Sequence, residues 1–132
     1  MRLEPLYRLR FRYPESFRAG DELLLFAEGR VEGRVSGRFR AANRARRRAD
    51  GSYLPALDGA IETGDGATIL LALTGCGEPQ AEPQGRVVAA IVHSADGDHA
   101  WLDGVLGVAA GEARDREVVL DVAELVWEPL AG

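Results

Sequence analysis

The stretch GRVEGRVSGRF, residues 29–39, alternates between two kinds of residue with a period of two. One set is glycine or apolar: Gly29, Val31, Gly33, Val35, Gly37 and Phe39. The other set, continued to residue 40, is polar and almost wholly charged: Arg30, Glu32, Arg34, Ser36, Arg38 and Arg40. Helical spacing would mix the two sets around a cylinder, so the period predicts one long strand with an apolar inner face. Glycine at every second inward position leaves little bulk and lets a sheet bend, as a curled sheet requires.

The same period recurs along most of the chain. It predicts strands over residues 7–13, 22–28, 53–63, 67–74, 86–94, 101–109 and 117–127. Tight turns are expected at 50–51, 64–66 and 96–98, and the segment 75–85 is the one long loop. Apart from a turn or two near Trp101, no stretch of ten residues has helical periodicity. We therefore predict an all-β fold: one domain over residues 1–132, an antiparallel β-barrel of about eight strands, closed like lipocalins or streptavidin.

Composition places the chain among ordinary globular proteins. It is 46% hydrophobic and 28% charged, which excludes disorder as the main state. No run of about 18 apolar residues is present, so we expect no membrane partner. Arginines interrupt the N-terminal apolar stretch and Cys76 is the only cysteine, which favours the cytoplasm.

The charges are divided unevenly along the chain. All 16 basic residues are arginine; residues 1–50 hold 13 of them against 7 acids, and residues 51–132 hold 3 against 14. We interpret the two halves as neighbouring strands of one body, with arginines facing carboxylates. Such cross-strand pairs contribute about 0.2–1 kcal/mol each.

Several motifs resemble those of a known family. They are LEPLYRLRF, GRVEGRVSGRFRAANRARRRADG, LDGAIETGDGATILL, DHAWLDGVLGVAAGEA and VVLDVAEL, and together they span nearly the whole chain. They resemble the bacterial and fungal domain-of-unknown-function family numbered 3237, which implies a small antiparallel β-barrel and no particular reaction. The family pattern has an aspartate–tryptophan pair where this chain has Asn43 and Arg44, an arginine at Asp58 and an asparagine at Asp103. The resemblance thus puts Asn43 and Arg44 among the candidate ligand-binding residues.

Cofactor and nucleotide motifs are absent from the sequence. A chain without lysine has neither a phosphate-binding P-loop nor a Schiff-base lysine. The segment 75–79 lacks the third glycine of a dinucleotide fingerprint, and Ser36 is out of position for a nucleophile elbow. We therefore expect no cofactor.

Two polar segments have competing interpretations. The arginines at 44 and 46–48 suit phosphates, but a solvated hairpin facing the acidic half explains them better, so we expect no nucleic-acid partner. His93, Asp96, Asp98 and His99 include metal-ligand types, but a plain Asp-Gly turn with the histidines on opposite sides is favoured. We predict no metal site.

His93 is the main candidate for a catalytic group. It shares its parity with Val87, Ala89 and Ile91 and comes just before a turn, so we expect it at a barrel mouth. An imidazole moves protons near neutral pH and would act as the base. The alternative is a core histidine whose hydrogen bonds are satisfied within the protein.

Three further residues complete the predicted site if they also face the interior. Asp58 or Asp103 would orient His93, and Trp101 would form a wall of the pocket. The alternatives are packing for Trp101 and exposure at strand ends for both aspartates.

The resulting functional hypothesis is a barrel that binds a small, largely apolar molecule. Any reaction would be cofactor-free acid–base chemistry such as isomerisation, cyclisation or dehydration, and whether the protein is an enzyme stays open. The alternative is a non-catalytic binding or assembly module whose barrel is filled by its own side chains. A homodimer is also expected, because the C-terminal segment has more apolar surface than one face needs: Leu125, Val126, Trp127 and Leu130.

Overall fold

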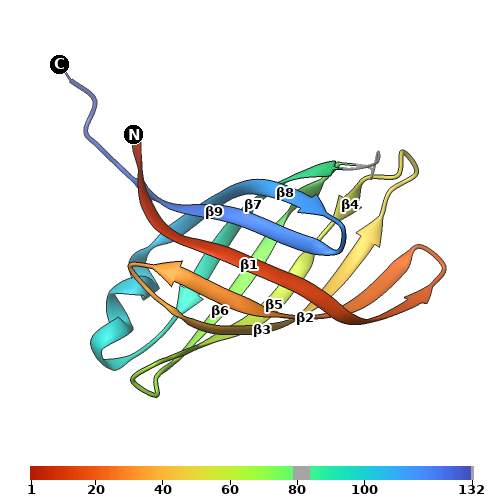
Figure 1. The fold of residues 1–132 in the computed structure, drawn as a ribbon. Helices are drawn as coiled ribbons and strands as arrows, with labels where there is room; N and C mark the ends of the chain where they lie inside the picture. Colours follow the sequence, from red (N-terminus) through yellow and green to blue (C-terminus); the bar gives the residue numbers. More distant parts are fainter. Residues whose placement is uncertain (79–83, 132) are drawn as a thin grey trace.

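The computed structural model describes residues 1–78 and 84–131 of the chain, and nearly all of them belong to one antiparallel sheet (Figure 1). The strands are β1 Arg2–Ala19, β2 Glu22–Gly33, β3 Gly37–Arg47, β4 Tyr53–Leu54, β5 Ala56–Thr63, β6 Thr68–Gly77, β7 Gln84–Ser94, β8 Leu106–Arg114 and β9 Glu117–Val126. A 3-10 helix, η1 (Gly97–Gly104), connects β7 to β8. Within the described residues, no helix is long and apolar enough to cross a membrane.

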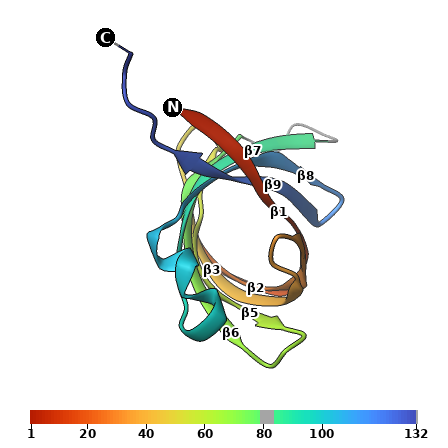
Figure 2. The ribbon, with the colours of Figure 1, turned by 90° about the vertical axis from the view of Figure 1, so that its left-hand side faces the viewer.

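The sheet closes on itself. Each long strand pairs with the next one along the chain, and β1 pairs with β9, from Arg2 opposite Val126 to Arg12 opposite Glu117. The two-residue β4 lies between β3 and β6 at one end. Seen along its length in Figure 2, the molecule is a ring of strands with η1 at the near end. The predicted closed antiparallel barrel of about eight strands is confirmed.

The interior is built by alternate residues of every long strand. Phe11, Phe39 and Ile61 meet at its centre from β1, β3 and β5, while the residues between them on each strand face outward. The Phe39 ring lies 5.5 Å from that of Phe11, so aromatic contacts fill the middle of the barrel.

The 29–39 repeat forms two strands rather than the single strand predicted. β2 ends at Gly33 and β3 begins at Gly37. Gly33 has a φ of 155°, and a Cβ there would lie 2.6 Å from the Leu6 carbonyl oxygen, so only glycine allows this close approach. Val35, inside the turn, is still buried in the core, so the period of two continues through the turn. Periodicity alone therefore gave no sign of the break.

The predicted strand over 101–109 is also wrong in its first half, because η1 occupies residues 97–104. The Asp103 carboxylate accepts a hydrogen bond of 2.7 Å from the Ala95 backbone N–H, which folds the segment back on itself. Leu102 is the one buried residue of η1 and packs into the core. The predicted strand over 53–63 is divided into β4 and β5 at Pro55, which cannot donate a ladder hydrogen bond.

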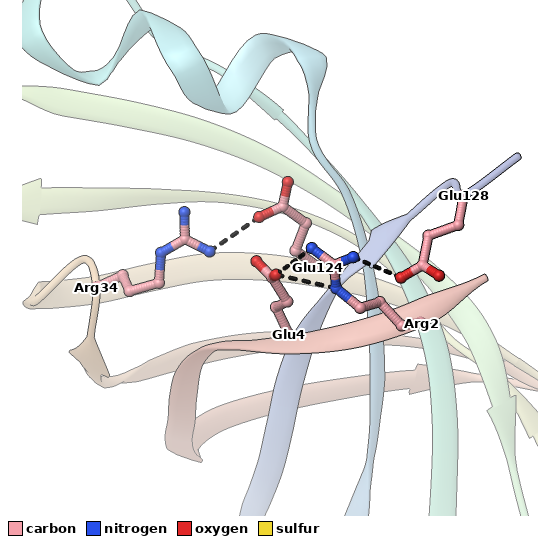
Figure 3. A network of polar contacts seen from close by, with 5 residues as sticks. All are labelled: Arg2, Glu4, Arg34, Glu124 and Glu128. Carbon is pink, nitrogen blue, oxygen red and sulfur yellow. Dashed lines mark hydrogen bonds and ion pairs between the residues drawn. The ribbon is translucent and has the colours of Figure 1, made fainter.

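Arginines of residues 1–50 do face carboxylates of residues 51–132, as predicted. Arg8 pairs with Asp121 at 2.8 Å, Arg10 with Glu117 at 3.4 Å and Arg40 with Glu62 at 2.7 Å. Figure 3 shows a further group near the chain ends, in which Arg2 contacts Glu4 and Glu128 and Arg34 contacts Glu124. These side chains are largely exposed, so each pair contributes little to stability.

Candidate functional site

One end of the barrel holds a buried tyrosine–histidine pair. The Tyr7 hydroxyl, from β1, lies 2.8 Å from His93 Nε2, from the end of β7, and the two rings meet edge to face at 5.8 Å. Tyr7 is 4% exposed and His93 is 7% exposed. Leu102 of η1 is fully buried and packs into the same core, so this end of the barrel is closed.

Burial sets the protonation states of this pair. It raises the pKa of the Tyr7 phenol, which therefore stays protonated and is available as a donor. Burial also lowers the pKa of His93, and the backbone of Val105 opposes that shift. A neutral imidazole beside a protonated phenol is best assigned as accepting the Tyr7 hydrogen at Nε2 and carrying its own proton on Nδ1.

The other imidazole nitrogen has no hydrogen bond of normal geometry. Among the described residues, His93 Nδ1 is the buried side-chain nitrogen or oxygen atom left without a partner. The backbone of Val105 is close enough to influence its pKa, but the contact does not satisfy that nitrogen. An unsatisfied buried donor costs stability, so His93 is more than a plain packing residue.

The opposite end holds a second tyrosine pair. Asn43 Nδ2 donates to the Tyr13 hydroxyl at 2.9 Å, and the Ala56 backbone N–H donates to Asn43 Oδ1 at 3.1 Å. Asn43 is 4% exposed, while Tyr13 is half-buried. Burial raises the pKa of Tyr13 and the Asn43 hydrogen bond lowers it. The net shift is upward, so this hydroxyl is also protonated at neutral pH.

Strand direction explains why the two pairs lie at opposite ends. β1, β3 and β8 run parallel to one another and β7 runs the other way. Tyr13 and Asn43 come late in β1 and β3, whereas Tyr7 comes early in β1 and His93 late in β7.

Small apolar side chains surround the Tyr13 end and remain partly exposed. They pack against the core on the inward parity of their strands and are Ala41, Val87, Ala89 and Ala113. By contrast, the core residues around His93, including Leu71 and Ile91, are buried. Among the described residues, the lining is therefore buried at the Tyr7–His93 end, which we call the closed end, and partly exposed at the Tyr13–Asn43 end, which we call the open end.

The predicted convergence on His93 is wrong for the two aspartates. Asp58 is exposed on the outer face of β5, because Leu57 and Ile61 occupy the inward parity of that strand. Asp103 is exposed in η1, where its carboxylate holds the Ala95 backbone. Neither side chain can orient the His93 imidazole from these positions.

Trp101 also lies outside the barrel. It is 40% exposed on η1, and the Arg34 guanidinium lies 4.8 Å from its ring centroid. The expected pocket wall is instead the outer surface of η1, held against the β2–β3 turn by a cation–π contact.

The two neighbouring candidates for ligand binding, Asn43 and Arg44, point to opposite faces of β3, as successive residues on a strand do. Asn43 faces the interior and Arg44 faces solvent, 3.9 Å from Glu22. His93 was expected at a mouth of the barrel; it does lie at an end, but η1 covers it.

The histidine-rich turn does not assemble a metal site in the part of the chain that the structure describes. His99 contacts Asp65 at 3.4 Å, whereas His93 contacts Tyr7, so the two histidines have different partners. No group of three histidine, cysteine or acidic side chains is found there in metal-binding geometry.

Two surface hollows lie on the outside of the barrel. The larger, about 490 Å³, is formed over β1 and β2 with Arg10, Glu28 and Arg30 among its lining residues. The smaller, about 370 Å³, lies beside the β8–β9 turn. Neither includes His93 or Tyr13.

Sequence reasoning missed both tyrosines. Tyr7 and Tyr13 stand on the inward parity of the first strand, with Leu9 and Phe11 between them. A phenol on a buried face usually needs a hydrogen-bond partner. The need of each buried phenol for a partner was therefore the signal in the sequence that polar side chains of other strands would contact Tyr7 and Tyr13.

Comparison with known proteins identifies the fold and no activity. A β-barrel-like protein from Acinetobacter baumannii matches with a TM-score of 0.86 and 18% identity, over 95% of this chain and 96% of that one. A conserved protein of unknown function from Rhodopseudomonas palustris gives 0.83 and 19%, over 95% and 97%. A protein of unknown function from Clostridium acetobutylicum gives 0.80 and 15%, over 96% and 100%.

No family model and no curated protein matches the chain. Membership of the family numbered 3237 therefore stays a prediction.

Proposed function

We propose that the protein binds a small, largely apolar molecule in the open end of its barrel. The observation that carries the proposal is the Tyr13–Asn43 pair, which places a hydroxyl and an amide among small apolar side chains that solvent reaches. Binding sites for small molecules combine an apolar lining with a few polar groups in this way.

The chemistry of the pair indicates what the ligand carries. Tyr13 is protonated and can donate one hydrogen, while the Asn43 amide has a second N–H besides the one given to Tyr13. Both groups suit a ligand hydroxyl or carbonyl oxygen. Ala89 and Ala113 are small, partly exposed apolar residues on the inward parity at this end. The expected ligand is thus a compact apolar ring or chain with one oxygen function.

A suitable probe is 2-naphthol, an apolar bicycle with one hydroxyl, followed by NMR of the backbone amides. We expect saturable shifts at Tyr13, Ala89 and Ala113. Replacing Ala89 with Phe should weaken binding by about tenfold or more, equivalent to about 1.4 kcal/mol, because the new ring occupies the lumen. The matched control is Ala42→Phe, which places the same ring on the outer face of β3 and should leave affinity unchanged.

Tyr13→Phe provides a test that preserves shape. It should reduce naphthol affinity, whereas Tyr7→Phe at the closed end should not. Absence of saturable shifts at the open end, or equal losses in the Ala89 and Ala42 variants, would refute the proposal.

The alternative function, a non-catalytic module with a filled barrel, is favoured by one observation. Leu9, Phe39 and Ile61 are fully buried across the middle of the lumen. A ligand is therefore proposed for the open end alone. Acid–base catalysis by His93 stays a prediction; a substrate would have to displace η1 to reach its free Nδ1.

A further inference from the structure

The outer face of β6, β7 and β8 carries no charged side chain over three consecutive cross-strand rows. We name it the apolar wall, and it consists of Leu70, Ala72, Thr74, Cys76, Val88, Ala90, Val92, Leu106, Val108 and Ala110. The three strands lie side by side in Figure 1. Leu70, Val88 and Val92 are each more than half exposed, at 55%, 56% and 54%. Large aliphatic side chains at this exposure, gathered on one face, are typical of an interaction surface.

Register shows that the wall is continuous. Val92 lies opposite Ala72 on one side and Leu106 on the other, and Ala90 lies between Thr74 and Val108. The third row joins Cys76, Val88 and Ala110 in the same way. Charges begin at the margins of these rows, where Asp58 of β5 lies opposite Ala72 and Asp121 of β9 lies opposite Ala110. The Arg48 guanidinium reaches one corner of the wall, where it donates to Cys76 Sγ at 3.1 Å. An apolar centre with a charged rim is the arrangement found at protein–protein interfaces.

The outer face on the opposite side of the barrel is charged. Arg10, Arg30 and Arg38 lie directly opposite one another on β1, β2 and β3. A second copy placed on that face would bring like charges together, which is unfavourable. The apolar wall has its charges at the rim and none at its centre, so a twofold contact with itself buries apolar side chains, as a contact through the arginine face would not.

We infer that the apolar wall is the contact surface of a homodimer, with the same wall of a second copy as its occupant. Closed twofold pairing through one shared patch is the commonest form of oligomer, and sheets pack face to face through apolar side chains. Seven residues along β6 and five along each of β7 and β8 give a sheet area of about 270 Å² from standard strand spacings. An area of this size belongs to a weak, reversible dimer.

Small and large side chains alternate within the wall. Alanines at 72, 90 and 110 lie among the larger Val88, Val92 and Leu106. Two such faces can interdigitate, with the large side chains of one copy seated over the alanines of the other. A charged or polar partner protein would find no complementary group at the centre of the wall, which is why a second copy is the better occupant.

The test is the mass in solution, measured by sedimentation equilibrium at micromolar concentrations against a chain mass of 14.2 kDa. Wild-type protein should show a monomer–dimer equilibrium. Val92→Arg should raise the dissociation constant by about tenfold or more, because a charge would be buried at the centre of the contact. Ala90→Glu should have the same effect with the opposite sign of charge.

The matched control is Ala42→Arg on the outer face of β3, which should leave the mass distribution unchanged. Circular dichroism establishes that each variant is folded. A wild-type protein that stays monomeric, or a Val92→Arg variant that dimerises like wild type, overturns the inference. Dissociation by Trp127→Ala, with none by Val92→Arg, would likewise overturn it in favour of the C-terminal segment.

Discussion

The two ends of the barrel use the same kind of pair for different purposes. Each has a tyrosine of β1, Tyr7 or Tyr13, hydrogen-bonded to a polar side chain of another strand. At the Tyr7 end, η1 and large aliphatic residues exclude solvent; at the Tyr13 end, alanines lie near a tyrosine that stays partly exposed. The difference shows that what surrounds a buried hydroxyl, more than the hydroxyl itself, decides whether it stabilises the fold or can contact a ligand.

The largest expected effect comes from opening the closed end. Leu102→Ala should lower the free energy of unfolding by about 2–4 kcal/mol, because the side chain is fully buried and its loss leaves a cavity. Trp101→Ala, one residue earlier on the exposed side of η1, should cost about 1 kcal/mol or less. Urea denaturation measures both, and equal costs would show that η1 does not close the barrel.

A pair of identical substitutions compares the two ends directly. Tyr7→Phe should cost about 1–3 kcal/mol, since it leaves His93 Nε2 without its hydrogen-bond partner in a buried site. Tyr13→Phe should cost about 1 kcal/mol or less, because Tyr13 is only partly buried and Asn43 keeps its hydrogen bond from the Ala56 backbone. If the Tyr13 variant lost more stability than the Tyr7 variant, the assignment of open and closed ends would be reversed.

The closed end should also make stability depend on pH. The pKa of His93 is lowered in the folded protein, so below about pH 6.5 the unfolded chain binds a proton that the folded chain does not. Stability should therefore fall as pH drops through that value towards the folded pKa. Wild type should melt at a higher temperature than His93→Gln near neutral pH, and this difference should narrow as the pH falls. The His99→Gln variant should lose stability on acidification in the same way as wild type.

The smallest effects are expected from surface arginines at the two ends. Arg34→Gln removes the contacts with Trp101 and Glu124 at the closed end and should cost about 0.5–1 kcal/mol. Arg44→Gln, at the open end, loses one exposed 3.9 Å pair and should change stability by less than about 0.5 kcal/mol. Thermal denaturation at low salt resolves the two, and a larger loss at Arg44 would contradict this ranking.

The alternation of residues was enough to predict the barrel, because it states which residues share a face. It placed His93 on the parity of Val87, Ala89 and Ile91, and these residues do face the interior. It failed at Asp58, whose strand has small apolar residues on both parities, so the face that enters the core was ambiguous.

The pairs themselves lay beyond any local pattern. Tyr7 and His93 are 86 residues apart in sequence, and Tyr13 and Asn43 are 30 apart. Which residues meet across a barrel depends on the stagger between its strands, and the register shifts in β1 add to that stagger. The turn or two of helix allowed near Trp101 is η1, but a strand was also predicted to begin at Trp101, since the fold of η1 depends on the Asp103 contact with Ala95 and not on a helical period.

The pairing of β1 with β9 has a consequence for how the chain may be cut and rejoined. Arg2 lies opposite Val126, and Figures 1 and 2 show both ends of the chain leaving the barrel side by side. A short peptide could link them without crossing the molecule, and the chain could be opened instead at the Asp115–Arg116 turn, where both residues have positive φ. Every ladder would survive this circular permutation. Because the barrel is a closed ring, the strand at which the chain begins has no special place in the structure.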